Sequence, residues 1–459
     1  MSERVSRVRT MDTARWYRLA ACIIAMMAVA NLQYAWTLFV PPLMESLHAT
    51  LSTVQVAFTC FVVTQAFLLP ATAYLIDRVG ARLIISCAAF LVGLSWILCG
   101  LAGSLPFLYF ASSIGGIGAG GVYGGCIGLA MKWFPDRRGF CVGLVAGAYG
   151  FGTALTAIPI SQMISTNGYR AAFITWGIVQ WLVILVAAQF LISPPEGWFP
   201  AGWEQTKARI QSRVQQSARD YTAGQMMRTK AFYALYVMMT VVAFSGLMVM
   251  AQLAPIAKTF HHDTYVLFGG VTVLGLTMVL DGVLNGITRP LFGWVSDNIG
   301  RYDTMAISFG LEAVAIIGLT FVGGRAGWFI VLTGMTFFAW GEIYSLFPSA
   351  IADLFGSKYA TTNFSIQYTA KGVASVLAGP LAAWITEING GSWLPVLWAA
   401  IVGNLVAAFL ALFWLKSTAA RQLRADALGA THVSPDPLSE GESLATDPTE
   451  GSESATSAS

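Results

Sequence analysis

Charge is scarce in this chain. Only 11% of its 459 residues are Asp, Glu, Lys or Arg, whereas 56% are hydrophobic and the mean hydropathy is +0.65. A soluble domain carries about 25% charged residues. The composition therefore excludes an ordinary soluble domain and indicates a membrane protein.

Residues suited to catalysis or metal binding are also few. The four histidines fall in loops or in the tail, which argues against a histidine proton relay inside the membrane, and the six cysteines show no disulfide or metal spacing. The glycine-rich run at 115–125 is not followed by Gly-Lys-Ser/Thr, so we interpret it as helix packing and expect no ATP-driven pumping. No nucleophile, base and orienting acid assemble in the loops. We therefore expect no enzyme activity, no cofactor, no metal and no nucleic-acid partner.

Long apolar runs, by contrast, recur along the whole sequence. Runs of roughly 20 residues with few charges fit the ~30 Å hydrocarbon core of a lipid bilayer. Most of the 26 lysines and arginines fall in the terminal segments and in alternate loops, so the positive-inside rule predicts that both termini are cytoplasmic. The runs predict an all-α membrane protein with twelve transmembrane helices, near residues 19–40, 53–76, 83–101, 106–131, 140–163, 171–193, 232–257, 265–294, 304–323, 327–354, 361–386 and 392–415.

The runs divide into two halves of six. A polar linker separates them, with a helix expected around Glu204–Arg219. The last residues are acidic and rich in Ser, Thr, Pro and Ala, a composition typical of disorder. We expect a cytoplasmic amino-terminal segment at 1–18, a first bundle at 19–193, a linker at 194–231, a second bundle at 232–416 and a disordered acidic tail at 417–459.

A short motif repeats six spans apart. It follows the second span as Asp77-Arg78-Val79-Gly80-Ala81-Arg82 and the eighth as Asp297-Asn298-Ile299-Gly300-Arg301, with Gly293 just before the second copy. Gly and Arg could mark a cytoplasmic turn and nothing more, but two copies in register indicate duplicated halves. The motif resembles that of the major facilitator superfamily, which implies two six-helix bundles around a central substrate site. In that family these residues form a conformational latch, although Asn298 replaces the arginine in the second copy.

Ionisable residues within the spans are candidates for function. Arg289 and Lys371 are the two cations away from the span ends, about 12 Å and 20 Å from the cytoplasmic ends of their helices. An arginine cannot shed its charge, so inside a membrane it needs a polar cavity, a counter-charge or an anionic ligand. Pairing with Asp281, Glu312 or Glu342 is the structural alternative. We interpret Glu312 as structural; Glu342 or Asp281 could also take part in coupling to protons.

Aromatic residues lie at similar depth, and with their neighbours they resemble the oxalate/formate antiporter family. The motifs are Gln33-Tyr34-Ala35-Trp36, Val54-Gln55, Trp133-Phe134-Pro135-Asp136, Asn285-Gly286 with Arg289-Pro290, Trp340-Gly341 with Tyr344, and Ala370-Lys371. The resemblance implies that Arg289 and Lys371 bind a dicarboxylate inside a cage of Tyr34, Tyr123, Tyr149, Trp340 and Tyr344. Gln55 matches the glutamine that the family has on its second helix and is therefore a candidate substrate-binding residue, although its depth favours a gate contact at the outer rim over a central one. Tyr368 and Glu342 depart from the oxalate transporter, which has tryptophan and a small residue there, so Tyr368 is a candidate contact that alters selectivity.

The sequence therefore predicts a secondary transporter of small organic anions in a cell (inner) membrane, working as a monomer by alternating access. Oxalate:formate antiport is the leading hypothesis. Proton-coupled uptake of a monocarboxylate is the alternative among transporters. A transporter-like carboxylate sensor is the alternative of another class, although the linker and tail carry no kinase, nucleotide-binding or receiver pattern.

Overall fold

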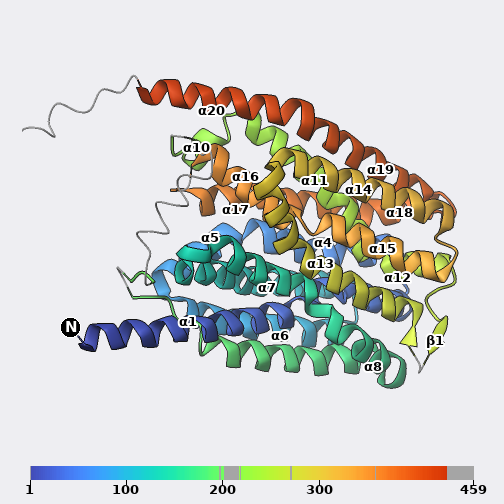
Figure 1. Cartoon of the computed structure of the whole chain (residues 1–459). Helices are drawn as coiled ribbons and strands as arrows, with labels where there is room; N and C mark the ends of the chain where they lie inside the picture. Colours follow the sequence, from blue (N-terminus) through green and yellow to red (C-terminus); the bar gives the residue numbers. More distant parts are fainter. Residues whose placement is uncertain are drawn as a thin grey trace, which may run out of the picture.

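The computed structural model of the protein describes residues 2–195, 198–200, 217, 219–268, 271–356 and 358–431. Nearly all of them are helical. Figure 1 shows the first half, blue to green, packed beside the second half, yellow to red. The first half contains α1 Ser2–Val29, α2 Asn31–Tyr34, α3 Trp36–Ser46, α4 Leu51–Phe67, α5 Leu69–Val79, α6 Ala81–Leu101, α7 Leu105–Trp133, the 3-10 turn η1 Pro135–Arg137 and α8 Arg138–Ala188.

The second half begins after the linker, and a two-stranded hairpin precedes its second long helix. Its elements are α10 Ala223–Met226, α11 Lys230–Ala251, α12 Leu253–Thr259, β1 Val266–Phe268, β2 Val271–Thr272, α13 Val273–Ile299, α14 Arg301–Val322, α15 Ala326–Trp340, α16 Ile343–Phe355, α17 Ala360–Val376, the π-helical η2 Leu377–Leu381, α18 Ala382–Ile388, α19 Leu394–Phe409, the π-helical η3 Leu410–Leu415 and α20 Lys416–Thr431.

Each predicted span overlaps a helix. In the described residues, eight helices are long and apolar enough to cross a membrane, or nine if the bent pair α4–α5 is one span. Helix α8 accounts for two predicted spans, because its chain reverses at Gly168, where φ is 83°. Helices α13 and α17, which carry Arg289 and Lys371, are not among the eight. Because every predicted span overlaps a helix and at least eight helices within the described residues can cross a membrane, the predicted all-α membrane architecture is confirmed.

Two predicted boundaries are wrong. The eighth span does not begin near Tyr265 but at Val273, because 266–268 and 271–272 pair as antiparallel strands and Thr272 then caps α13 by accepting a hydrogen bond from the Gly275 N–H at 3.1 Å. Val, Leu and Phe suit a strand as well as a span, so hydropathy did not separate the two. At the other end of the second half, α20 continues helically to Thr431 instead of becoming disordered at 417.

The end of the linker holds α20 against the second half. Ser217 Oγ and Tyr221 OH donate to the two carboxylate oxygens of Asp426 at 2.7 and 2.6 Å. The Tyr221 N–H donates to the carbonyl of Phe355 at 2.9 Å. These bonds explain why an acidic residue that composition assigned to the tail is helical. The predicted linker helix around Glu204–Arg219 and the tail beyond 431 lie outside the described residues, apart from 217 and 219.

The repeated motif forms the same turn twice. Gly80, between α5 and α6, has φ 102° and ψ 145°, and Gly300, between α13 and α14, has φ 100° and ψ 152°. This positive φ is readily available only to glycine, which explains why both copies keep it. We call the end of the bundle with these turns and the linker the linker side, and the end with the β1–β2 hairpin the hairpin side (Figure 1).

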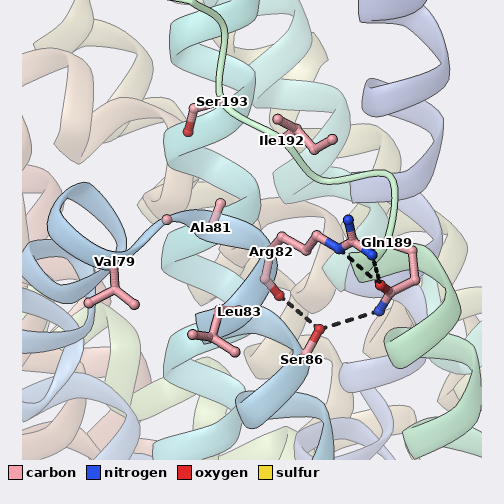
Figure 2. A pocket seen from close by; sticks show the side chains of 9 residues that line it. Val79, Ala81, Arg82, Leu83, Ser86, Gln189, Ile192 and Ser193 are labelled. Atoms are coloured by element: carbon pink, nitrogen blue, oxygen red, sulfur yellow. Dashed lines mark hydrogen bonds between the residues drawn. The ribbon is translucent and has the colours of Figure 1, made fainter.

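The motif arginines bind within their own halves. Arg82 donates through Nε and Nη2 to Gln189 Oε1 at 3.0 and 2.6 Å, beside a cavity of about 590 Å³ between α6 and the end of the sixth span (Figure 2). Arg78 lies over the Tyr74 ring at 4.6 Å. Arg301 makes salt bridges with Asp297 at 2.6 Å and Asp353 at 3.1 Å. Nothing lies within 4 Å of a Cβ built on Gly293, and the side chain of Asp77 is outside the described residues.

Candidate functional site

The two halves meet closely at α8 and α13. A Cβ built on Gly147 would lie 2.6 Å from the carbonyl oxygen of Gly286, and one on Gly150 would lie 2.9 Å from Asn285 Oδ1. Only residues without a side chain permit backbones to approach this closely. This contact places Arg289, one turn beyond Gly286 on α13, against the first half.

Arg289 is buried, and no acidic residue in the described part of the chain pairs with it. Its Nη1 donates to the carbonyl of Ala146 in α8, and its Nη2 donates to Tyr34 OH at 3.5 Å. The guanidinium carbon lies 4.6 Å from the centroid of the Tyr344 ring. Its Nε–H has no hydrogen-bond acceptor among the described residues. The predicted alternative, a salt bridge with Asp281, Glu312 or Glu342, is not formed.

Lys371, on α17, is equally buried, and its ammonium group is enclosed by neutral oxygens. Its Nζ donates to Gln33 Oε1 and Gln65 Oε1, each at 2.8 Å, and to Tyr368 OH at 3.1 Å. Nζ also lies 5.6 Å from the centroid of the Tyr344 ring. The first half therefore supplies two of the three acceptors of a cation that belongs to the second half.

The aromatic residues form one continuous chain of ring contacts across the two halves. Ring centroids are 5.7 Å apart for Tyr34 and Tyr149, 5.4 Å for Tyr149 and Tyr123, 5.7 Å for Tyr123 and Tyr368, 6.0 Å for Tyr368 and Tyr344, and 5.4 Å for Tyr344 and Trp340. All six side chains are buried. The structure thus brings together the five aromatic residues predicted for the cage and Tyr368.

Two of these aromatic residues carry donors that are not used. The Tyr344 hydroxyl and the Trp340 indole N–H are buried without a partner among the described residues, as is the Nε–H of Arg289. An unsatisfied buried polar group costs about 1–3 kcal/mol. Donors without acceptors beside two cations are complementary to an anion, which brings acceptors and negative charge together.

Gln55 lies outside this cluster. Its Nε2 donates to Ala251 O and Gln252 Oε1, both at 2.9 Å, and its Oε1 accepts from Trp36 Nε1 at 3.2 Å. Further bonds between the halves lie toward the hairpin side: Ala254 N–H donates to Thr37 Oγ1 at 2.8 Å, and the backbone and hydroxyl of Ser52 donate to Glu387 at 2.8 and 2.9 Å. Gln55 therefore belongs to the contact that joins the halves beyond the cluster, as its depth predicted.

Three amides in the cluster were not predicted as site residues. Gln33 and Gln65 hold Lys371, and Tyr149 OH donates to Gln33 Oε1 at 2.9 Å. Asn285 Nδ2 donates to Tyr34 OH at 2.9 Å. Each amide lies in an apolar run, where a side chain with two donors and an acceptor needs partners. The need for hydrogen-bond partners inside an apolar run could have identified all three amides as candidate site residues.

The two acids proposed for coupling are buried and lack hydrogen-bond partners among the described residues. Asp281 lies beside Thr333. Glu342 lies beside Glu312 and Ser308 of α14. Neither acid contacts Arg289 or Lys371, so neither neutralises the cations.

Comparison with known proteins fits this architecture. The family model described as Major Facilitator Superfamily matches residues 21–284 and again 235–448. The chain belongs to the Major Facilitator Superfamily. Two overlapping matches agree with the duplicated halves and with the glycine turns at Gly80 and Gly300. This superfamily member is a multi-pass membrane transporter.

Individual relatives identify the family within the superfamily. The Oxalate:formate antiporter of Oxalobacter formigenes is 33% identical over 402 residues, which cover 87% of this chain and 91% of that protein. An uncharacterized 38 kDa protein of Thermoproteus tenax is 29% identical over 87% of this chain and 96% of its own length. The uncharacterized MFS-type transporter YhjX of Escherichia coli K12 is 26% identical over 79% of this chain and 86% of its own. Within the superfamily, the chain belongs to the oxalate/formate antiporter family.

Proposed function

We propose that this transporter exchanges small carboxylates, oxalate for formate in the first instance, at the cluster around Arg289 and Lys371. The observation that carries the proposal is a pair of buried cations that have no acidic partner among the residues the structure describes, next to donors that have no acceptor there. A dicarboxylate supplies two negative charges and four acceptor oxygens. The similarity to the Oxalate:formate antiporter of Oxalobacter formigenes supports the same substrate class.

The cluster also favours exchange over one-way transport. A buried charge without compensation is costly, so a site that returns empty must desolvate two cations each time the halves close. A bound anion neutralises the cations and lowers that cost. The glutamine oxygens around Lys371 offset its charge only in part, because they carry dipoles and no net charge.

Counterflow in proteoliposomes tests the exchange. Vesicles are loaded with oxalate, formate, sulfate or buffer alone, and the uptake of labelled oxalate is followed with and without a protonophore. We expect uptake only when the interior holds oxalate or formate, and we expect it to persist with the protonophore. Equal uptake into empty vesicles would overturn exchange. A panel of unlabelled carboxylates competing with labelled oxalate then defines the preferred anion and shows whether Tyr368 admits longer dicarboxylates.

Proton-coupled uptake of a monocarboxylate is the second candidate. The carboxyl oxygens of Asp281 and Glu342, which have no partner within the described parts of the chain, favour it, because a buried acid without a cation or donor is readily protonated. Uptake that collapses with the protonophore but ignores the internal anion would support this candidate over exchange.

Three further features remain proposals. The linker side is cytoplasmic, as the distribution of Lys and Arg predicts, and a reporter fused to either terminus checks it. The Gly80 and Gly300 turns act as a conformational latch on that side. The transporter works as a monomer, which the molecular mass of the active protein in detergent, corrected for bound detergent, would test.

A further inference from the structure

The second half holds a polar cluster that does not touch the proposed anion site. It consists of Glu312 on α14, Glu342 between α15 and α16, Ser245 on α11 and Asn404 on α19. All four side chains are fully buried, with 0% of their surface exposed. Three helices of one half and the junction between two others therefore converge on two carboxyl groups.

The hydrogen bonds of this cluster leave most of its carboxyl oxygens free. Ser245 Oγ donates to Glu312 Oε1 at 2.5 Å, and Asn404 Nδ2 donates to Ser245 Oγ at 3.1 Å. Within the described residues, Glu312 Oε2 and both oxygens of Glu342 have no partner. The Ser308 hydroxyl lies beside Glu342 but donates to the carbonyl of Ala339 at 2.6 Å.

No cation among the described residues compensates these acids. Glu312 is the titratable group that acts electrostatically on Glu342. The ionisable groups of the neighbouring helices face elsewhere, since on α13 Asp281 lies beside Thr333 and Arg289 lies over Tyr344, and on α17 Lys371 lies between Gln33, Gln65 and Tyr368. Adjacent carboxylates without a cation repel each other, and burial adds the cost of desolvation. The pair is therefore far more stable when it holds protons.

A path of contacts joins this pair to the anion site. Glu342 lies at the junction of α15 and α16, between Trp340 and Tyr344 of the aromatic chain. At the same junction, a Cβ built on Gly341 would lie 2.6 Å from Asn285 Oδ1. Asn285 in turn donates to Tyr34, which contacts Arg289. Protonation or deprotonation of Glu342 therefore changes the charge at the junction between α15 and α16, which lies next to both Tyr344 and Asn285.

We infer that Glu312 and Glu342 together form a proton-binding site whose occupancy is linked to anion binding. Without substrate the pair holds one proton between its two acids, and the negative charge of an anion bound beside Tyr344 raises the proton affinity of the pair, so anion binding takes up a second proton. The linkage rests on the proposed anion site, whereas the proton site itself does not. The two acids form one titrating unit, because Glu312 acts electrostatically on Glu342.

Infrared spectroscopy tests the proton site without any substrate. Purified protein near neutral pH is compared with the double variant Glu312→Gln/Glu342→Gln, with each single variant and with Glu45→Gln, which changes an exposed acid. We expect absorption from a protonated carboxylic acid that shifts in heavy water, falls in the double variant and changes in frequency in each single variant, where the proton is confined to one acid. The single variants keep the test decisive if the double variant does not fold. Unchanged absorption in every Glu312 and Glu342 variant would overturn the proposal.

Proton uptake tests the linkage. Oxalate is added to the protein in weakly buffered solution containing a pH indicator, and bound oxalate is measured in the same samples. We expect about one proton to be taken up per oxalate bound, and no uptake in the double variant. Uptake that persists in the double variant and disappears in Asp281→Asn would overturn the assignment to this pair. Oxalate binding that requires sodium, without proton uptake, would overturn the choice of a proton.

The two proposals fail differently. Absence of oxalate binding in the unaltered protein contradicts the proposed substrate, while the infrared result still decides the proton site. The uptake measurement is then repeated with whichever carboxylate of the panel binds. Binding of that carboxylate without proton uptake contradicts the linkage.

Discussion

Arg289 and Lys371 lie over the same aromatic ring. The guanidinium carbon is 4.6 Å and the ammonium nitrogen 5.6 Å from the centroid of Tyr344, so the two charges are at most about 10 Å apart, the sum of these distances. They come from helices α13 and α17 of the same half, and both donate to residues of the first half. An anion between them would contact both halves at once, which links substrate binding to their relative position.

Replacement of Lys371 by Gln tests the two-cation site. Glutamine keeps a polar side chain but removes one positive charge, and a hydrogen bond to a charged group contributes about 1.5–3 kcal/mol. We expect oxalate affinity to fall about 10- to 100-fold. Formate affinity should fall less, because one cation suffices for one carboxylate. Competition binding with labelled oxalate measures both effects.

The matched control is Lys258→Gln, because Lys258 is an exposed cation in the last turn of α12. It should leave both affinities unchanged. Retained oxalate affinity in Lys371→Gln, in protein that still elutes as a single species from a sizing column, would refute the two-cation site.

Gln65→Glu places a fixed carboxylate where an anion would bind. Gln65 Oε1 lies 2.8 Å from Lys371 Nζ, so a glutamate there neutralises the lysine permanently. We expect oxalate exchange to be lost and the melting temperature to rise, because a buried cation gains a charged partner. Gln162→Glu, at an exposed position of α8, should change neither. Normal exchange by Gln65→Glu would show that Lys371 does not hold the anion.

The two cations could be predicted from the sequence because burying a charge is expensive and leaves few interpretations. Gln33, Gln65 and Asn285 were not predicted as site residues, for the opposite reason. A buried amide costs less than a buried charge, and its partners lie far away in the chain: Gln33 and Lys371 are separated by 338 positions. Such contacts depend on how the halves pack, which hydropathy does not encode.

The two wrongly predicted boundaries, at the start of the eighth span and at the start of the tail, also depend on contacts that hydropathy does not encode. Val266 and Phe268 are apolar enough to extend a span, and only their pairing with Thr272 and Val271 makes them a hairpin. Asp426 belongs by composition to the acidic tail, yet Ser217 and Tyr221 fix it within a helix. The duplicated turn could be predicted from the sequence. Both turns need a positive φ, which few residues other than glycine adopt, so glycine stands at the same position of the motif in both halves.

Gly147→Ala tests the contact between the halves. The added methyl would lie 2.6 Å from the Gly286 carbonyl oxygen, a backbone atom that cannot move aside independently. Overpacking of this kind costs about 1–3 kcal/mol. Here it destabilises the arrangement in which α8 and α13 are in contact. We expect the initial rate of oxalate counterflow to fall about tenfold. Gly128→Ala is the control, since a Cβ at that position of α7 meets nothing within 4 Å. Equal rates in the two variants would contradict the close approach of α8 and α13.

Asp426→Asn tests the contact that fixes α20. Asp426 accepts hydrogen bonds from Ser217 and Tyr221, and burial together with this carboxylate raises the pKa of Tyr221 to about 12. Because the docked tyrosine holds its proton more tightly than a free one, the docked linker loses stability as pH rises from about 10 towards 12. We expect the asparagine variant to have a lower tyrosine pKa by ultraviolet titration and faster proteolysis of the linker near neutral pH. Asp263→Asn, in the loop before the hairpin, should alter neither. A variant with unchanged proteolysis would show that the linker docks without Asp426.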